Sequence, residues 1–198
     1  MRKGQSRACK AVPQNRSEAS AFGQAQRPIT DTMKTIDLLQ ALSRESVEFV
    51  LVGGLAVQLH GYARMTYDVD VVLAMNDANL SRFIEVAKQF GLAPVIPAPI
   101  DSLKNASLLD QWHREKGMLA FALREPSIGG GIVDVLVKPE VGFEELSAQA
   151  VVGQLLGSSV KIASIDHLLA MKRVANRPKD QLDIIALEKI KRGEDPNA

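Results

Sequence analysis

"VGGLAVQLHGYARMTYDVDVVL", residues 52–73, places two glycines, a short apolar segment and two alternating aspartates between two apolar runs. The runs VEFVLVGG (47–54) and YDVDVVLAM (67–75) have the pattern of buried strands. The segment LAVQLHG (55–61) between them predicts a short helix that ends at its glycine. The stretch therefore predicts a strand, a short helix and a second strand in direct succession, with both acids on the second strand.

The two acids of this second strand predict a cation site. Asp68 and Asp70 are two residues apart, so in a strand their side chains project from the same face. Two carboxylates about 5 Å apart repel by roughly 3 kcal/mol at an effective dielectric constant of 20. A hard divalent cation, Mg²⁺ or Mn²⁺, relieves this repulsion and keeps positions for water and substrate phosphates. The alternative is a solvated strand edge, because short acidic pairs are common.

A third acid, Asp134, lies in the apolar run GIVDVLV (131–137). A lone ionised acid among apolar groups is costly, so Asp134 needs a partner. A neighbouring strand would bring it beside Asp68 and Asp70. There it would be a third metal ligand or the base that takes a proton from an attacking hydroxyl. The alternative is an edge-strand acid that faces water.

The Gly-Gly turn and the residues just before the acids predict a phosphate site. Gly53 and Gly54 have no Cβ atoms, so a phosphate can approach backbone N–H groups where the strand turns into the helix. Arg64 and Thr66 are placed to hold the β- and γ-phosphates, although a surface role is commoner for a single Arg. A phosphate site beside a cation site indicates a nucleoside triphosphate (NTP) as co-substrate.

A lysine near the end of the chain is a further candidate. In the helix that begins at Ser164, Lys172 shares a face with apolar residues and so points toward the interior. We expect Lys172 to reach a phosphate or the metal-binding acids, with Asp180 orienting its ammonium group; snorkelling of the side chain to solvent is the alternative. Asp183 is the competing candidate for orienting this ammonium group; the alternative is that Asp183 only caps the helix or pairs with Lys179 at i,i+4.

The remaining pattern predicts an α/β (α+β) fold with a mixed central sheet, flanking helices and a C-terminal helical pair. The expected elements are a helix from Met33, a helix over 77–90, a loop or edge segment over 93–100, a hairpin from 117–125 to 131–139, a short helix over 143–150, short strands within 151–163, and helices over 164–176 and 177–192.

The first 32 residues differ in composition from the rest. They are rich in Gln, Ser, Ala, Arg and Pro and have almost no apolar periodicity, so residues 1–32 are expected to be a disordered leader. A transit peptide and a start codon assigned too early are alternative explanations of this leader. Residues 33–198 are expected to form one domain.

Composition limits the partners and the compartment. Lys and Arg total 24 against 23 Asp and Glu, which argues against a generally basic nucleic-acid-binding surface but allows a local patch at residues 172–179. The single Cys9 gives no disulfide framework and no thiolate metal site, which suits a reducing cytoplasm. The sequence has no apolar run long enough to span a bilayer, so no membrane partner is expected.

The motifs together resemble a known signature. Gly53-Gly54, then HGYARMTYDVDVVL (60–73), then Asp134 is similar to the pattern of the DNA polymerase β-like nucleotidyltransferase superfamily. The Arg-x-Thr-x-Asp-x-Asp run and MKRVANRPKDQLDI (171–184) most resemble small bacterial AbiEii-type nucleotidyltransferases. The likeness covers most of residues 33–190. Gly54 departs from the commoner Ser of the superfamily, which removes one hydroxyl contact.

This resemblance implies a minimal nucleotidyltransferase fold and an activity. The enzyme would move a nucleoside monophosphate from an NTP to a hydroxyl of an RNA or tRNA end, a protein or a small molecule, as part of a toxin–antitoxin or defence module. Asp68, Asp70 and Asp134 would hold the metal. The alternative is an antitoxin-like or non-catalytic member of the fold that acts through a protein interface.

Overall fold

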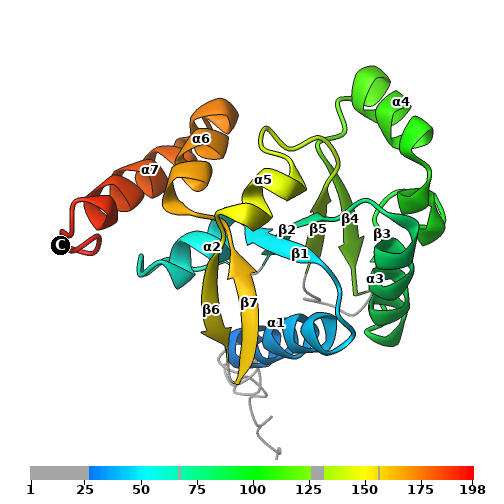
Figure 1. Cartoon of the computed structure of the whole chain (residues 1–198), viewed down its shortest axis with the longest axis horizontal. Helices are drawn as coiled ribbons and strands as arrows, with labels where there is room; N and C mark the ends of the chain where they lie inside the picture. The colour runs from blue at the N-terminus through cyan, green and yellow to red at the C-terminus, as the bar shows by residue number, and fades with distance from the viewer. Residues whose placement is uncertain (1–26, 67, 126–131, 156) are drawn as a thin grey trace, which may run out of the picture.

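The computed structural model describes residues 27–66, 68–125, 132–155 and 157–198 (Figure 1). Its helices are α1 (Arg27–Arg44), α2 (Gly53–Leu59), α3 (Asp77–Gln89), the 3₁₀ helix η1 (Ile100–Lys104), α4 (Ala106–Lys116), α5 (Phe143–Ala148), α6 (Ile165–Ala175) and α7 (Pro178–Lys191). Its strands are β1 (Phe49–Val52), β2 (Asp68–Leu73), β3 (Ala93–Pro94), β4 (Ala120–Arg124), β5 (Ile132–Leu136), β6 (Val151–Leu155) and β7 (Ser158–Ile162).

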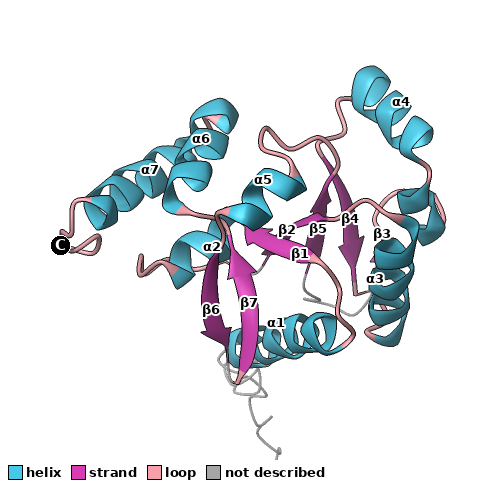
Figure 2. Ribbon diagram, in the orientation of Figure 1, coloured by secondary structure: helices cyan, strands magenta, loops and turns pink. Residues whose placement is uncertain are grey.

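The described strands form one mixed sheet of seven, in the order β3-β4-β5-β2-β1-β7-β6. Strand β1 runs antiparallel to β2 and parallel to β7, while β2 runs parallel to β5. Figure 2 shows the sheet in the middle of the molecule, with helices around it and the α6–α7 pair at one end. The predicted α/β fold with a mixed central sheet and a C-terminal helical pair is therefore confirmed.

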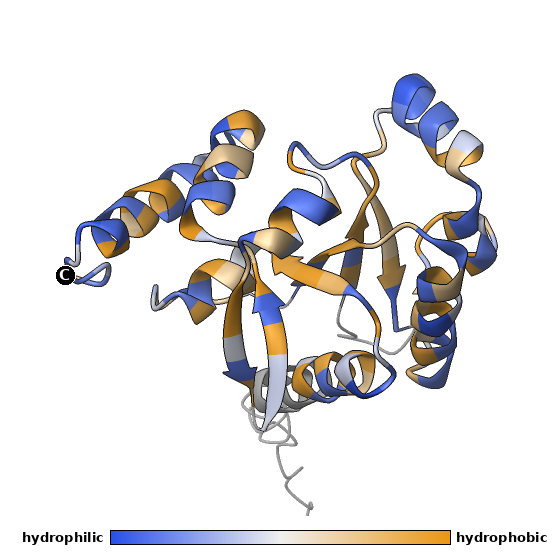
Figure 3. Ribbon diagram, viewed as in Figure 1, coloured by the Kyte–Doolittle hydropathy of each residue, from blue (hydrophilic) through white to orange (hydrophobic). Residues whose placement is uncertain are grey.

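In strand β2 one face is wholly apolar and the other face carries the acids. In β2, Val69 and Val71 are buried, whereas Asp68 and Asp70 project from the opposite face and stay half-buried. Helices α1 and α3 contact each other and contribute buried leucines and Phe83 to the core. Figure 3 shows the apolar residues concentrated on the central strands. The acids lie at the end of their face that adjoins the Gly-Gly turn, whereas the other end of that face is in the core, where Val72 lies opposite the buried Val50.

Several local predictions are confirmed. Helix α3 begins after Asn76, whose side chain accepts a hydrogen bond from the Asn79 N–H, and the chain turns at Gly91 with φ +66°. Strands β4 and β5 form the predicted antiparallel hairpin, although its connecting residues 126–131 lie outside the described part. Strands β6 and β7 form a second hairpin.

Two elements differ from the sequence prediction. Helix α1 begins at Arg27 rather than Met33, so residues 27–32 are helical; Pro28 lies in the first turn, where its missing N–H breaks no helical hydrogen bond. The rest of the expected leader, residues 1–26, lies outside the described residues. Helix α4 was not predicted, although Asn105 caps its first turn and Gly117, with φ +64°, ends it.

No helix in the described ranges combines the length and the apolar character needed to cross a bilayer.

Candidate active site

The three aspartates come together through strand pairing. In the parallel β2–β5 ladder Asp70 lies opposite Asp134, and Asp68 lies opposite Ile132. Strand β1 pairs on the other side of β2 and places Val52, the last residue before the Gly-Gly turn, opposite Asp70. The acids, the turn and the start of α2 therefore meet at one end of the three central strands.

The pKa values of Asp70 and Asp134 are raised by burial and by neighbouring carboxylates. Burial raises the pKa of Asp70, a hydrogen bond from the Gly54 N–H partly offsets this, and the nearby Asp68 carboxylate raises it again. Burial also raises the pKa of Asp134, and the charges of Asp70 and Asp68 add to it, to give a value of about 6. A carboxylate with a pKa near 6 is ionised at neutral pH and is a better proton acceptor than an ordinary aspartate.

The donor set fits a hard divalent cation. Mg²⁺ is usually bound by one or two carboxylates and completes its octahedron with water and substrate phosphates. Asp68 and Asp70 on one strand face, with Asp134 beside them, supply such oxygens. In the described ranges, no group of three His, Cys, Asp or Glu side chains is arranged to hold a metal ion. A cation here would take one or two of these carboxylates and its other ligands from water or a substrate.

The two glycines are required by the protein's own side chains. Gly53 has φ +66°, and a Cβ atom there would lie 1.9 Å from Oδ2 of Asp70. A Cβ atom on Gly54 would lie 3.0 Å from Oγ1 of Thr66 and 3.1 Å from Nη2 of Arg64. The Gly-Gly turn thus lets Asp70, Arg64 and Thr66 close onto the backbone. This is a reason for the glycines that the sequence did not reveal, in addition to the expected phosphate contact.

Arg64 and Asp183 differ from their simplest sequence interpretations. Nη1 of Arg64 donates to Oδ2 of Asp183, so Arg64 is anchored rather than free at the surface. Asp183 is 2% exposed and also accepts a hydrogen bond from Nζ of Lys172 at 2.5 Å. Asp183 therefore contacts the Lys172 ammonium, as the competing candidate would, and its ion-pair partners are Arg64 and Lys172 rather than Lys179. The buried Lys172 and the half-buried Arg64 are less screened by solvent than an exposed i,i+4 partner.

Lys172 lies inside the protein. It is 5% exposed, which excludes snorkelling, and Nζ also donates to Oδ1 of Asp180 at 3.3 Å. Its charge lowers the pKa of Asp70, so it acts electrostatically on the acid cluster. The structure thus places Lys172 between Asp70 and the acids of α7, with Asp180 and Asp183 as its hydrogen-bond partners.

Asp180 is held by the start of its own helix. Burial alone would raise the pKa of Asp180, but hydrogen bonds from the side chain and backbone of Arg177, with the charge of Lys172, lower it to about 2. Its Oδ2 accepts from the Arg177 backbone at 3.1 Å and from Nε at 2.7 Å. Its oxygens are thus occupied by Arg177 and Lys172, and the ammonium of Lys172 is shared between Asp180 at 3.3 Å and Asp183 at 2.5 Å.

Sequence reasoning did not include Lys179 among the site residues. Its charge lowers the pKa of both Asp70 and Asp134, and the charge of Asp70 in turn raises the pKa of Arg177. Lys179 is exposed. The signal was the Arg-Pro-Lys-Asp turn, in which the proline starts α7 between Arg177 and Lys179.

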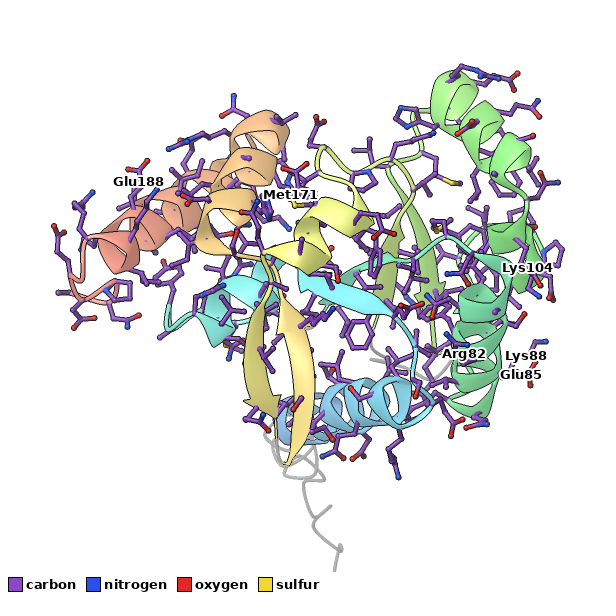
Figure 4. The ribbon with its side chains drawn as sticks, viewed as in Figure 1. Arg82, Glu85, Lys88, Lys104, Met171 and Glu188 are labelled. Atoms are coloured by element: carbon purple, nitrogen blue, oxygen red, sulfur yellow. The ribbon has the colours of Figure 1, made fainter. Side chains whose placement is uncertain are left out.

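Other charged groups lie away from this centre. Figure 4 shows Arg82, Glu85, Lys88 and Lys104 around α3, on the opposite side of the molecule from α6 and α7. Glu188 lies on the outer side of α7, where it pairs with Arg173 at 2.8 Å in an exposed ion pair. These groups are therefore separate from the acid site.

A pocket of about 300 Å³ adjoins Arg64 and Thr66, the residues that we expect to hold the phosphates. Arg64 and Thr66 line it, together with largely apolar side chains from α1, α2 and β6 that include Leu39, Leu55 and Leu155. Its size is at the lower end for small-molecule sites.

Comparison with known proteins gives a distant structural likeness. No protein-family model matches the chain, and no curated protein matches it. The crystal structure of an antigenic nucleotidyltransferase-like protein from Paracoccidioides brasiliensis is similar to this chain with a TM-score of 0.47 and 21% sequence identity. The likeness covers 80% of this chain and 76% of that one. At this distance none of that protein's properties passes to this chain, so any function must be derived from the residues of the site.

Proposed function

We propose that the protein is a Mg²⁺-dependent nucleotidyltransferase that moves a nucleoside monophosphate from an NTP to a hydroxyl acceptor. The observation that carries this proposal is the pairing of Asp70 with Asp134 in adjacent strands, with Asp68 on the same face and the Gly-Gly turn against Asp70. The charge of Asp68 raises the pKa of Asp70, and both charges raise the pKa of Asp134. A cation would relieve this repulsion, and a triphosphate would supply the remaining oxygen ligands.

We assign one role in the reaction to the pair of Asp68 and Asp70 and a separate role to Asp134. Asp68 and Asp70 would hold Mg²⁺, which when bound neutralises charge on the phosphates. Asp134, with a pKa of about 6, would accept the proton of the attacking hydroxyl. The acceptor oxygen bonds to the α-phosphorus, the bond to the bridging oxygen breaks, and pyrophosphate leaves.

The phosphates would lie against the basic side of the site. The guanidinium of Arg64 and the hydroxyl of Thr66 both lie at Gly54, one residue from the contact between Gly53 and Asp70. Lys172 and Lys179 add positive charge that already acts on Asp70. Preorganised donors and cations of this kind stabilise charge that develops on a transferred phosphoryl group. The resemblance to AbiEii-type enzymes supports an RNA or tRNA end as one acceptor class, with protein and small-molecule hydroxyls as the others.

The test is a labelling screen. Each of the four α-³²P-labelled NTPs is incubated with Mg²⁺ and the protein, alone and with total RNA, and products are separated by size. We expect label in RNA or in the protein itself, and no label when Asp70→Asn replaces the wild type. If the wild type transfers no label but forms a stable complex with another protein, the antitoxin-like alternative replaces the enzyme.

A further inference from the structure

One oxygen of Asp183 receives two cations from different parts of the chain. Oδ2 accepts from Nη1 of Arg64, in the loop before β2, and from Nζ of Lys172 on α6. Asp183 itself lies on α7 and is 2% exposed. The carboxylate and Lys172 are buried and Arg64 is half-buried, so water screens these pairs only partly, and charge-assisted hydrogen bonds of this kind are the strong ones. Asp183 therefore joins both C-terminal helices to the loop that leads into Asp68.

The same contact sets the direction of the Arg64 guanidinium. Nη1 is bound to Asp183, whereas Nη2 lies 3.1 Å from where Gly54 would carry a Cβ atom. One edge of the planar group is thus fixed to α7, and the other edge rests on the Gly-Gly turn. A planar guanidinium that is held at one edge presents its other donors in a defined direction.

We propose that Asp183 is a positioning residue of this site, which orients Arg64 toward the phosphates of the bound triphosphate. This inference rests on the proposed function. Asp183 itself touches no substrate; it acts through Arg64. Without its carboxylate the guanidinium keeps its charge but loses the direction that Asp183 imposes, so phosphate binding weakens.

The test asks whether the contribution of Arg64 to phosphate binding depends on Asp183. Inorganic tripolyphosphate with Mg²⁺ is titrated calorimetrically into the wild type, Arg64→Gln, Asp183→Asn and the double variant. We expect each single variant to bind about tenfold more weakly, and the double variant to bind no more weakly than the weaker single one. Glu188→Gln, which removes an exposed acid from the same helix, is the matched control and should bind as the wild type does.

A merely structural role would give a different pattern. In that case Asp183→Asn would lower the melting temperature but leave tripolyphosphate affinity unchanged. Alternatively, Arg64→Gln would reduce tripolyphosphate affinity by the same factor in the wild type and in Asp183→Asn. Either result overturns the positioning role while the proposed function stands. If the wild type binds neither tripolyphosphate nor any NTP, both proposals fall.

A second pair of backgrounds covers the case in which Asp183→Asn does not fold. Lys172→Met and the double variant Lys172→Met/Asp183→Asn differ only at Asp183. The double variant loses one buried positive and one buried negative charge, so neither is left without its partner. Arg64→Gln should weaken tripolyphosphate binding in the first background and have no effect in the second. An equal effect in both overturns the proposal.

Discussion

Replacing Asp134 with Asn removes a charge from the acid cluster at constant size, and it should stabilise the protein while abolishing transfer. The pKa of Asp134 rises from 3.8 to about 6 on folding, through burial and the charges of Asp70 and Asp68. At about 1.4 kcal/mol per pKa unit this is about 3 kcal/mol, and solvent screening of a half-buried carboxylate reduces it to about 1–2 kcal/mol. In a domain of this size that raises the melting temperature by about 3–6 °C.

The sign of the effect fixes its pH dependence. Because the folded state holds this proton more tightly than the unfolded chain, the ionised carboxylate destabilises the fold above pH 6, and the penalty disappears as pH falls toward 4. Asp134→Asn should therefore melt about 3–6 °C above the wild type at pH 8 and at nearly the same temperature at pH 4. Calorimetry at both pH values without divalent cations measures this, and Asp110→Asn, an exposed acid paired with Lys138, is the control. An unchanged or lower melting temperature at pH 8 would refute the charge repulsion that we infer.

Asp70→Asn should abolish Mg²⁺-dependent transfer. It should also abolish the rise in melting temperature that we expect Mg²⁺ to cause in the wild type at pH 8, and a thermal-shift titration with and without EDTA measures this rise. Gly53→Ala puts a Cβ atom 1.9 Å from Oδ2 of Asp70 at a backbone φ of +66°. It should lower the free energy of unfolding by about 1–3 kcal/mol, measured by urea denaturation, and reduce transfer at least tenfold. Full activity would contradict the close contact. Lys172→Met leaves Asp180 and Asp183 with one cation each. We expect the free energy of unfolding, measured by urea denaturation, to fall by about 2–3 kcal/mol. An unchanged urea midpoint would contradict the buried ion pairs.

Local rules account for the parts of the site that lie close together in the sequence. The two-residue period of a strand puts Asp68 and Asp70 on one face whatever surrounds them. Helical periodicity puts Lys172 on the buried side of α6, and the proline at the start of α7 sets the turn that places Asp180 within reach of it. These features depend only on backbone geometry over a few residues, so the sequence by itself determined them.

The tertiary structure alone decided which distant residues meet. Nothing in the apolar run around Asp134 states that β5 pairs in parallel with β2, in the register that sets it opposite Asp70. The partners of Asp183 were also open: local spacing allowed Lys172 or Lys179, and the folded chain selected Lys172 and added Arg64, 119 residues away in the sequence. Strand register and the pairing of buried charges depend on the free energy of the whole folded chain. A periodicity that extends over a few residues therefore cannot predict them.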